Sequence, residues 1–227
     1  EGDSALYVYD KFDVWKVDPS GSKPPVLYST PFGRQTKSRV RYTRLDPEER
    51  FIKHAQPMAF RIFSETDKTS FYHFEQNTGG SKLSYKIGEG RYGFNLKKKA
   101  KDDFRIIYTK ENYNQPADVY AGEINTGQVI QEKKLSAINL QQLNYYWGTA
   151  ELVKWKAYDG KETEGIVYKP ENFSPLQKYP MIAYFYETLS DGLHNYMAPA
   201  PTPSRLNIPF FVSRGYVVFA PDIHYGT

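Results

Sequence analysis

Two uninterrupted apolar runs in the last third of the chain constrain its fold more than any other feature. The runs are Met181–Tyr186 and Tyr216–Ala220, and a continuous apolar run of this length is typical of a strand buried on both faces of a sheet. Between the runs, Ile208–Arg214 predicts a short helix, because Pro209 suits a first helical turn and Gly215 suits a helix stop. The order strand, helix, strand predicts a parallel crossover, the unit from which open α/β sheets are built.

A predicted hairpin precedes these two runs. In Glu151–Ala157 apolar and lysine side chains alternate, which is typical of a half-buried strand. The dipeptide Asp159-Gly160 predicts a tight turn, and Gly165–Pro170 returns as the partner strand. We therefore expect an antiparallel hairpin that leads into the parallel pair.

The first two-thirds of the chain repeats a different unit. Each copy has a strand rich in aromatic residues, an acidic residue and a turn that contains glycine, which is typical of a β-hairpin. The three copies are Leu6–Gly21, Ser70–Gly80 and Asp118–Gly127. Their turn glycines recur roughly every 50 residues, a spacing that suits β-propeller blades of four short strands. Further strands are predicted before the second and third turns, over Met58–Phe63 and Phe104–Tyr108.

The composition supports a β-rich globular chain and argues against several other classes. Aromatic residues make up 16% of the sequence, and they favour pleated, half-buried surfaces. The sequence contains no cysteine, which excludes disulfides, thiol catalysis and cysteine-rich zinc sites. No apolar run approaches the roughly 18 residues of a membrane helix, so no membrane span is expected. The net charge of +4 is modest and no dense basic face is visible, so no nucleic-acid partner is expected.

Two stretches of the chain carry a family resemblance. Lys178–Tyr186 and Phe211–Asp222 resemble the prolyl oligopeptidase family of serine peptidases, in particular its dipeptidyl-peptidase and acylaminoacyl-peptidase-like branches. In this family a β-propeller precedes an α/β-hydrolase domain, which matches the order of the two patterns described above. The resemblance implies a mixed fold. Residues 1–145 would form a partial antiparallel β-propeller (its last blades), and residues 146–227 the N-terminal portion of an α/β-hydrolase domain.

The resemblance also implies a reaction, the hydrolysis of short peptides by a serine nucleophile with a histidine base, an aspartate and an oxyanion hole. In this fold the nucleophile lies in a G-x-S-x-G turn, and the sequence contains no such motif. Ser213 lacks the first glycine and precedes the wrong strand. We therefore expect a piece of a larger peptidase that is truncated before the nucleophile and is inactive alone.

One catalytic element is expected within the sequence. In the dipeptidyl-peptidase branch the residue after the first of the parallel strands is a tyrosine whose hydroxyl donates to the oxyanion, and Tyr186 occupies that position. Such a donor stabilises the transition state by about 3 kcal/mol. The alternative is a tyrosine that packs its ring at the end of a sheet. Glu187–Gly192 replaces the Gly-Gly-Pro or Ala-Gly-Pro turn common in the family, and His224–Gly226 replaces an Arg-Gly pair, which leaves the branch and the substrate preference open.

The remaining sequence patterns give weaker evidence for a function. Gly88–Gly93 matches the dinucleotide pattern G-x-G-x-x-G, but no helix is predicted to open after it, so a glycine-rich connection is the better interpretation. The four histidines lie far apart in the sequence, and neither a metal nor a cofactor is expected. Asp191 and His194 either line the mouth of an active site or belong to a solvated loop.

Two rival functions remain open. A stand-alone β-rich module that binds peptide or glycan would explain the aromatic strands, and it predicts no parallel pair of strands. A nucleic-acid binder ranks last. Open sheet edges would favour a homodimer. The sequence leaves the localisation open, with a periplasmic or secreted parent favoured.

Overall fold

The computed structural model describes residues 3–29, 32–46, 48–52, 58–78, 81–88, 90–101, 103–125, 128–201 and 204–224. The chain divides into two compact units. Unit 1 comprises Glu1–Gly90, Phe94–Tyr108 and Ala121–Lys133. Unit 2 comprises Arg91–Gly93, Thr109–Tyr120 and Lys134–Thr227.

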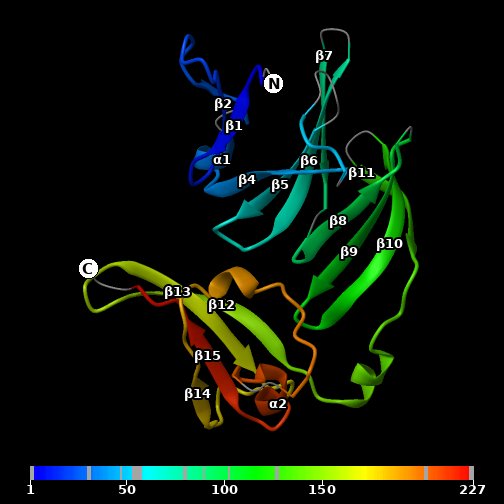
Figure 1. The fold of residues 1–227 in the computed structure, drawn as a ribbon. Coiled ribbons are helices and arrows are strands. Elements are labelled where there is room, and N and C mark those ends of the chain that lie inside the picture. Colours follow the sequence, from blue (N-terminus) through cyan, green and yellow to red (C-terminus); the bar gives the residue numbers. More distant parts are fainter. Residues whose placement is uncertain are drawn as a thin grey trace. The chain divides into compact units, whose positions relative to one another are not determined.

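Unit 1 contains two antiparallel sheets whose strands follow one another in chain order (Figure 1). The first sheet consists of β1 Leu6–Tyr9, β2 Val14–Val17 and β3 Val26–Leu27. A short helix, α1 Phe32–Gln35, leads into the second sheet. That sheet consists of β4 Ser38–Thr43, β5 Met58–Ser64, β6 Ser70–Thr78 and β7 Ser81–Ile87.

A third sheet again contains four strands in chain order. They are β8 Gly93–Lys99, β9 Arg105–Asn112, β10 Gln115–Asn125 and β11 Gln128–Lys134. The strands predicted before the second and third turns are confirmed as β5 and β9. The predicted turn residues 79, 80, 126 and 127 lie outside the described residues. At the first predicted turn the N–H of Gly21 donates to the carbonyl of Asp18 at 3.0 Å, and Gly21 has a φ of 72°.

The core of unit 1 joins its first two sheets. Five buried side chains form it: Val14, Val40, Met58, Phe60 and Ile62. The hydroxyl of Tyr28 lies 3.0 Å from the sulfur of Met58 at the edge of this cluster. Aromatic and branched side chains at alternating strand positions therefore bury one face of each sheet, as the composition predicts.

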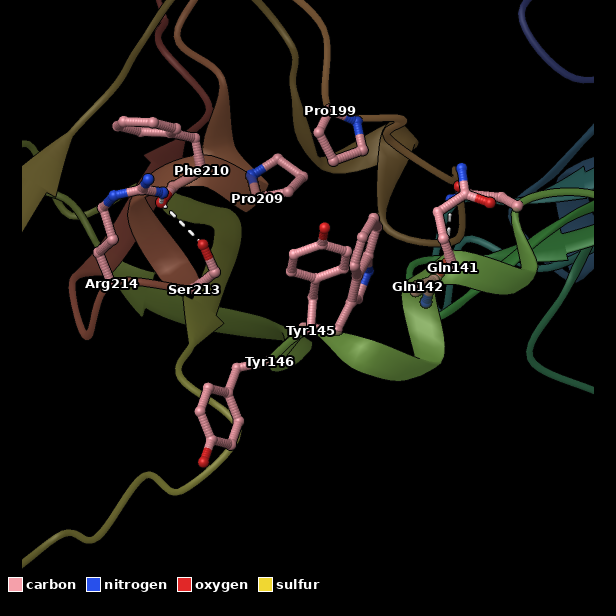
Figure 2. Close-up of a pocket in the computed structure, with 11 residues that line it drawn as sticks. Gln141, Gln142, Tyr145, Tyr146, Pro199, Pro209, Phe210, Ser213 and Arg214 are labelled. Carbon is pink, nitrogen blue, oxygen red and sulfur yellow. Dashed lines mark hydrogen bonds between the residues drawn. The ribbon is translucent and has the colours of Figure 1, made fainter.

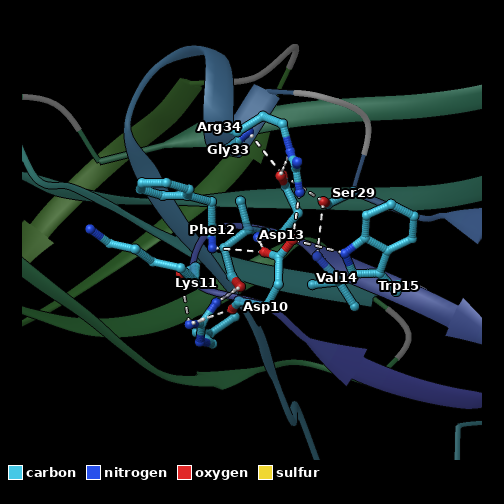
Figure 3. Close-up of polar contacts among 11 residues, drawn as sticks. Asp10, Lys11, Phe12, Asp13, Val14, Trp15, Ser29, Gly33 and Arg34 are labelled. Carbon is cyan, nitrogen blue, oxygen red and sulfur yellow. Dashed lines mark hydrogen bonds and ion pairs between the residues drawn. The ribbon is translucent and has the colours of Figure 1, made fainter.

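A buried carboxylate holds the start of β2 (Figure 3). Asp13, which is 0% exposed, accepts hydrogen bonds from the hydroxyl of Ser29 at 3.1 Å and from the N–H of Gly33 at 3.1 Å. The guanidinium of Arg34 donates to its other oxygen at 2.8 Å. The hydroxyl of Ser29 in turn accepts from the N–H of Val14 at 3.1 Å. We call this set of contacts the Asp13 latch, because it ties β2 to the segments on either side of residues 30 and 31.

The same arrangement recurs at Asp118, in unit 2. This buried carboxylate accepts from the hydroxyl of Ser136 at 2.7 Å, from the N–H of Ile138 at 2.9 Å and from Lys134 Nζ at 2.5 Å. Ser136 also accepts from the N–H of Val119 at 2.8 Å. Burial alone would raise the pKa of Asp118, but the hydrogen bonds from these three donors outweigh it and hold the pKa below its usual value. An Asp-Val dipeptide and a later serine thus form the same kind of latch at two places in the chain. We call the second set of contacts the Asp118 latch.

Unit 2 also contains the fourth sheet, whose order is β12-β13-β15-β14 (Figure 1). Its elements, with the short helices around them, are η1 Leu140–Asn144, β12 Thr149–Lys156, β13 Glu162–Lys169, β14 Met181–Ala183, η2 Ser190–Gly192, α2 Ile208–Val212 and β15 Val217–Pro221. The predicted hairpin is confirmed, since β12 and β13 are antiparallel. The predicted parallel crossover is also confirmed, because β14 pairs with β15 in parallel, with Ile182 opposite Val218. The side chain of Asn207 caps α2 by accepting from the N–H of Phe210 at 3.1 Å.

The prediction that Met181–Tyr186 is a strand buried on both faces is wrong. The strand ends at Ala183, and Met181 is 63% exposed. Among the described strands β14 pairs with β15 alone, so it lies at the edge of the sheet. In contrast, β15 lies between two partners, and its Val218 is fully buried. The apolar run correctly predicts that a strand is present. The burial of that strand depends on its neighbours in the sheet, which the run does not specify.

The core of unit 2 is built around Trp147. Its indole N–H donates to the carbonyl of Tyr113 at 2.6 Å, and its ring stacks on Tyr196 with centroids 5.4 Å apart. The other buried side chains of this core include Ile166, Tyr168, Leu193, Ile208, Val212 and Val218. Burial raises the pKa of both Tyr113 and Tyr168 above the ordinary value for a tyrosine.

Candidate functional site

Tyr186 lies just beyond the carboxyl end of β14. The N–H of Tyr184 donates to the carbonyl of Phe219 at 2.9 Å, and the N–H of Ile223 donates to the carbonyl of Glu187 at 3.1 Å. The backbone on both sides of Tyr186 is therefore fixed against β15 and the residues after it. The Tyr186 side chain itself is 67% exposed. In open α/β sheets, ligands bind outside the carboxyl ends of the parallel strands, and Tyr186 is at that edge.

A buried carboxylate anchors the loop that follows Tyr186. One oxygen of Asp222 accepts from the N–H groups of Leu189 and Ser190, at 2.7 and 2.8 Å. Its other oxygen accepts from the hydroxyl of Ser190 at 2.6 Å. The N–H of Asp222 donates to the carbonyl of Glu164 on β13 at 2.9 Å. The residue directly after β15 thus ties the loop to the end of the sheet.

The far end of the same loop is held by aromatic packing. Tyr196 stacks on Trp147, and its hydroxyl donates to the side chain of Gln142 at 2.9 Å. The side-chain amide of Asn139 donates to the same hydroxyl. Between these two anchors Leu193 and His194 are buried. The loop after Tyr186 is therefore a fixed structure and not the solvated loop that was one of the two expectations for His194.

The structure shows where the described residues that the sequence singles out lie in the fold. The resemblance places Tyr186 directly after the first parallel strand, but β14 ends at Ala183, so Tyr184 directly follows the strand and Tyr186 lies three residues beyond it. Ser213 follows α2, and its hydroxyl donates to the carbonyl of Phe210 at 3.0 Å, a helix-end contact. Residues 225–227 lie outside the described residues. The anchoring role of Asp222 was not predicted. Its one signal in the sequence is a carboxylate directly after an apolar strand.

Replacing Asp222 by asparagine is expected to loosen the loop after Tyr186. Asparagine keeps one carbonyl oxygen for the two backbone N–H groups but loses the charge that strengthens those hydrogen bonds, a loss of about 1–2 kcal/mol. Amide hydrogen exchange at Leu189 and Ser190 should therefore become roughly tenfold faster. Asp159→Asn, in the exposed β12–β13 turn, is the matched control and should leave both amides unchanged. Unaltered exchange in the Asp222 variant would show that the carboxylate does not hold the loop.

Comparison with known proteins identifies similarity in fold. No family model matches the chain, and no curated protein sequence matches it. Among solved structures, dipeptidyl peptidase 4 from Porphyromonas gingivalis is 15% identical with a TM-score of 0.62, over 96% of this chain and 28% of that one. A post-proline cleaving enzyme from Rickettsia typhi is 12% identical with a TM-score of 0.57, over 93% and 28%. The apo AtxE2 isopeptidase is 14% identical with a TM-score of 0.58, over 92% and 28%.

These structural neighbours are peptidases of the prolyl oligopeptidase family. It is the same family that Lys178–Tyr186 and Phe211–Asp222 resemble in sequence. The chain spans about 28% of the length of each neighbour. The likeness therefore concerns the fold of one part of those proteins. In the part of the chain that the structure describes, no helix is long and apolar enough to cross a membrane.

Proposed function

We propose that this chain is part of a serine peptidase of the prolyl oligopeptidase family. The four-stranded sheets β4–β7 and β8–β11 would be propeller blades, and the sheet β12–β15 would begin an α/β-hydrolase domain. The fold similarity to peptidases of that family supports this assignment. The parallel pairing of Met181–Ala183 with Val217–Phe219 also supports it, because a stand-alone β-rich binding module predicts no such pair.

The observation that carries the proposal is the position of Tyr186 three residues beyond the carboxyl end of β14. When a serine attacks a peptide carbonyl, negative charge develops on the carbonyl oxygen. A hydrogen-bond donor that is already in place stabilises that charge, and it acts more strongly where water is excluded. Tyr186 supplies a phenol O–H at this edge, and the Asp222 contacts hold the loop that follows it. We propose that Tyr186 is an oxyanion donor.

These 227 residues contain no G-x-S-x-G motif, so they lack the nucleophile turn that is typical of this fold. We propose that other parts of the protein contribute the nucleophile, the histidine and the aspartate. The substrates would be short peptides. The 227-residue chain alone would then neither hydrolyse peptides nor react with a fluorophosphonate probe.

Replacing Tyr186 by phenylalanine in the peptidase that contains this chain is expected to lower kcat/KM about 100-fold, because the ring remains while the oxyanion donor is lost. The loss should fall mainly on kcat, since the donor acts in the transition state and contributes little to substrate binding. The measurement is steady-state hydrolysis of a chromogenic dipeptide substrate.

Tyr184→Phe is the matched control, because Tyr184 lies two residues earlier and packs against the unit 2 core. Its activity should stay within a few-fold of the unsubstituted enzyme. A Tyr186→Phe variant that retains full kcat would remove the oxyanion role but leave the peptidase assignment standing. Stoichiometric fluorophosphonate labelling of the 227-residue chain would instead contradict the assignment of the nucleophile to another part of the protein.

A further inference from the structure

Unit 2 contains a pocket that the proposed peptidase chemistry does not use (Figure 2). Its volume is about 330 Å³, at the lower end of the range for small-molecule sites. Residues from η1, from the segment that follows it and from the region of α2 line it. They are Asn139, Gln141, Gln142, Tyr145, Tyr146, Trp147, Pro199, Pro209, Phe210, Ser213 and Arg214.

The apolar part of this pocket is built from rings. Trp147 and Pro209 are buried, whereas Tyr145 is 68% and Phe210 44% exposed. In Figure 2 the Tyr145 ring stands among Pro199, Pro209 and the end of η1, while the Tyr146 ring points away from them. Trp147 is held by its hydrogen bond to Tyr113 and by the Tyr196 stack, so this wall is formed before any ligand arrives. Flat rings at a pre-formed wall favour a flat ring in the ligand.

The charge of the pocket comes from one side chain. Among the eleven described residues that line it, Arg214 is the one charged residue at neutral pH. Its guanidinium lies 3.6 Å from the centroid of the Phe210 ring and donates to the Phe210 carbonyl at 3.1 Å. These contacts fix the plane of the guanidinium and use one of its five N–H donors. The lining therefore complements an anion through the remaining N–H donors of Arg214.

We propose that this pocket binds a compact carboxylate that carries an aromatic ring. The ring would lie against Tyr145, Trp147 and Pro209, and the carboxylate would meet Arg214. A water molecule occupies roughly 30 Å³ of liquid volume, so the pocket has room for a ligand of about ten non-hydrogen atoms. Both a free aryl acid and the C-terminal residue of a short peptide have this chemistry. The proposal does not depend on the peptidase function.

Four probes separate the parts of the proposal on the 227-residue chain. 4-Hydroxyphenylacetate carries the ring and the carboxylate, and tyrosol has the same ring with a hydroxyl in place of the carboxylate. N-acetyl-prolyl-phenylalanine and its C-terminal amide make the same comparison for a peptide. We expect at least one acid to bind with a Kd below about 1 mM, measured by saturation-transfer NMR and calorimetry, and its neutral partner to bind at least tenfold more weakly. The acid that binds more tightly identifies the source of the ligand.

Substitutions test whether the binding is at this pocket. Arg214→Gln should weaken binding of the acid at least tenfold, while Arg105→Gln, which removes the same charge from an exposed position of unit 1, should not. Tyr145→Ala should weaken it as well, with Tyr158→Ala, in the exposed β12–β13 turn, as its control. All four positions are exposed, and melting curves check that the variants fold. No saturable binding up to about 10 mM, equal binding of acid and neutral partner, or equal losses in the controls would each overturn the proposal.

Discussion

Asp13→Ala is expected to lower the free energy of unfolding of unit 1 by about 3 kcal/mol. The substitution removes the acceptor for the Ser29 hydroxyl, the Gly33 N–H and the Arg34 guanidinium at a position that is fully buried. A buried donor left without a partner costs about 1–3 kcal/mol, and loss of one member of a buried ion pair costs about 3–5 kcal/mol. Arg34 is half-exposed and regains water, which places the expected loss at the lower end of that range.

The NMR signal of the Trp15 indole N–H during urea unfolding is the natural measurement, because Trp15 lies on β2 two residues from Asp13 and its signal is separate from those of Trp147 and Trp155. Asp18→Ala is the control, since Asp18 caps the exposed turn after β2 by accepting from the Ser20 N–H at 3.0 Å. It should have a much smaller effect. Asp13→Asn should fall between the two, because it keeps the shape and one acceptor oxygen. Equal midpoints for Asp13→Ala and Asp18→Ala would show that the latch contributes nothing.

The Asp118 latch predicts that the same substitution has the same consequence in a second place. Asp118→Ala removes the acceptor of the Ser136 hydroxyl, the Ile138 N–H and the Lys134 ammonium in the same way. The pKa of Asp118 is lowered in the folded chain. Its contribution to stability is therefore present above the unfolded carboxyl pKa of about 3.9 and is lost as the pH falls through the lower, folded value. Two latches with matching contacts indicate a repeated structural unit, in agreement with the repeat that the sequence predicts over Leu6–Gly21 and Asp118–Gly127.

The secondary structure of this chain could be predicted from the sequence where the signal is local. The alternation in Glu151–Ala157 and the turn at Asp159-Gly160 are contained within a few residues, and β12 and β13 follow them. Pro209 and Gly215 are also local signals, and the helix α2 lies at the place that they predict. The parallel pairing of β14 with β15 follows from the order of elements, because a strand, a helix and a strand joined in this way return in the same direction.

The latches and the loop anchor could not be predicted because their partners are distant in the sequence. Asp13 and Ser29 are 16 residues apart, and Asp222 and Ser190 are 32 residues apart. The sequence shows an acidic residue beside an aromatic strand, which is equally typical of a solvated turn. Only the fold decides that Asp13 and Asp222 are buried and surrounded by donors. Tyr186 was placed at the sheet edge by a family resemblance, and that resemblance says nothing about what holds the following loop.

Gly148→Ala is expected to destabilise unit 2 by about 2–5 kcal/mol. Gly148 has a φ of 86°, a conformation that costs an L-residue about 1–2 kcal/mol. A Cβ added there would lie 2.1 Å from the carbonyl oxygen of Lys169 and 2.7 Å from a methyl carbon of Val212. Overpacking of this kind costs about 1–3 kcal/mol more. Because the nearer atom is backbone at the end of β13, relief requires β12 and β13 to move apart.

Gly160→Ala separates the two causes. Gly160 has a similar φ of 80°, but no described heavy atom lies within 4 Å of the position that its Cβ would take. Its substitution should therefore cost about 1–2 kcal/mol, the conformational part alone. The measurement is amide exchange across Ala150–Tyr168, a pair in the β12–β13 ladder. If Gly148→Ala and Gly160→Ala accelerate exchange equally, the close approach of Gly148 to Lys169 does not limit this sheet. A difference of about 2 kcal/mol or more between the destabilisations by the two variants would show that β12 can begin this close to Lys169 and Val212 because residue 148 is a glycine.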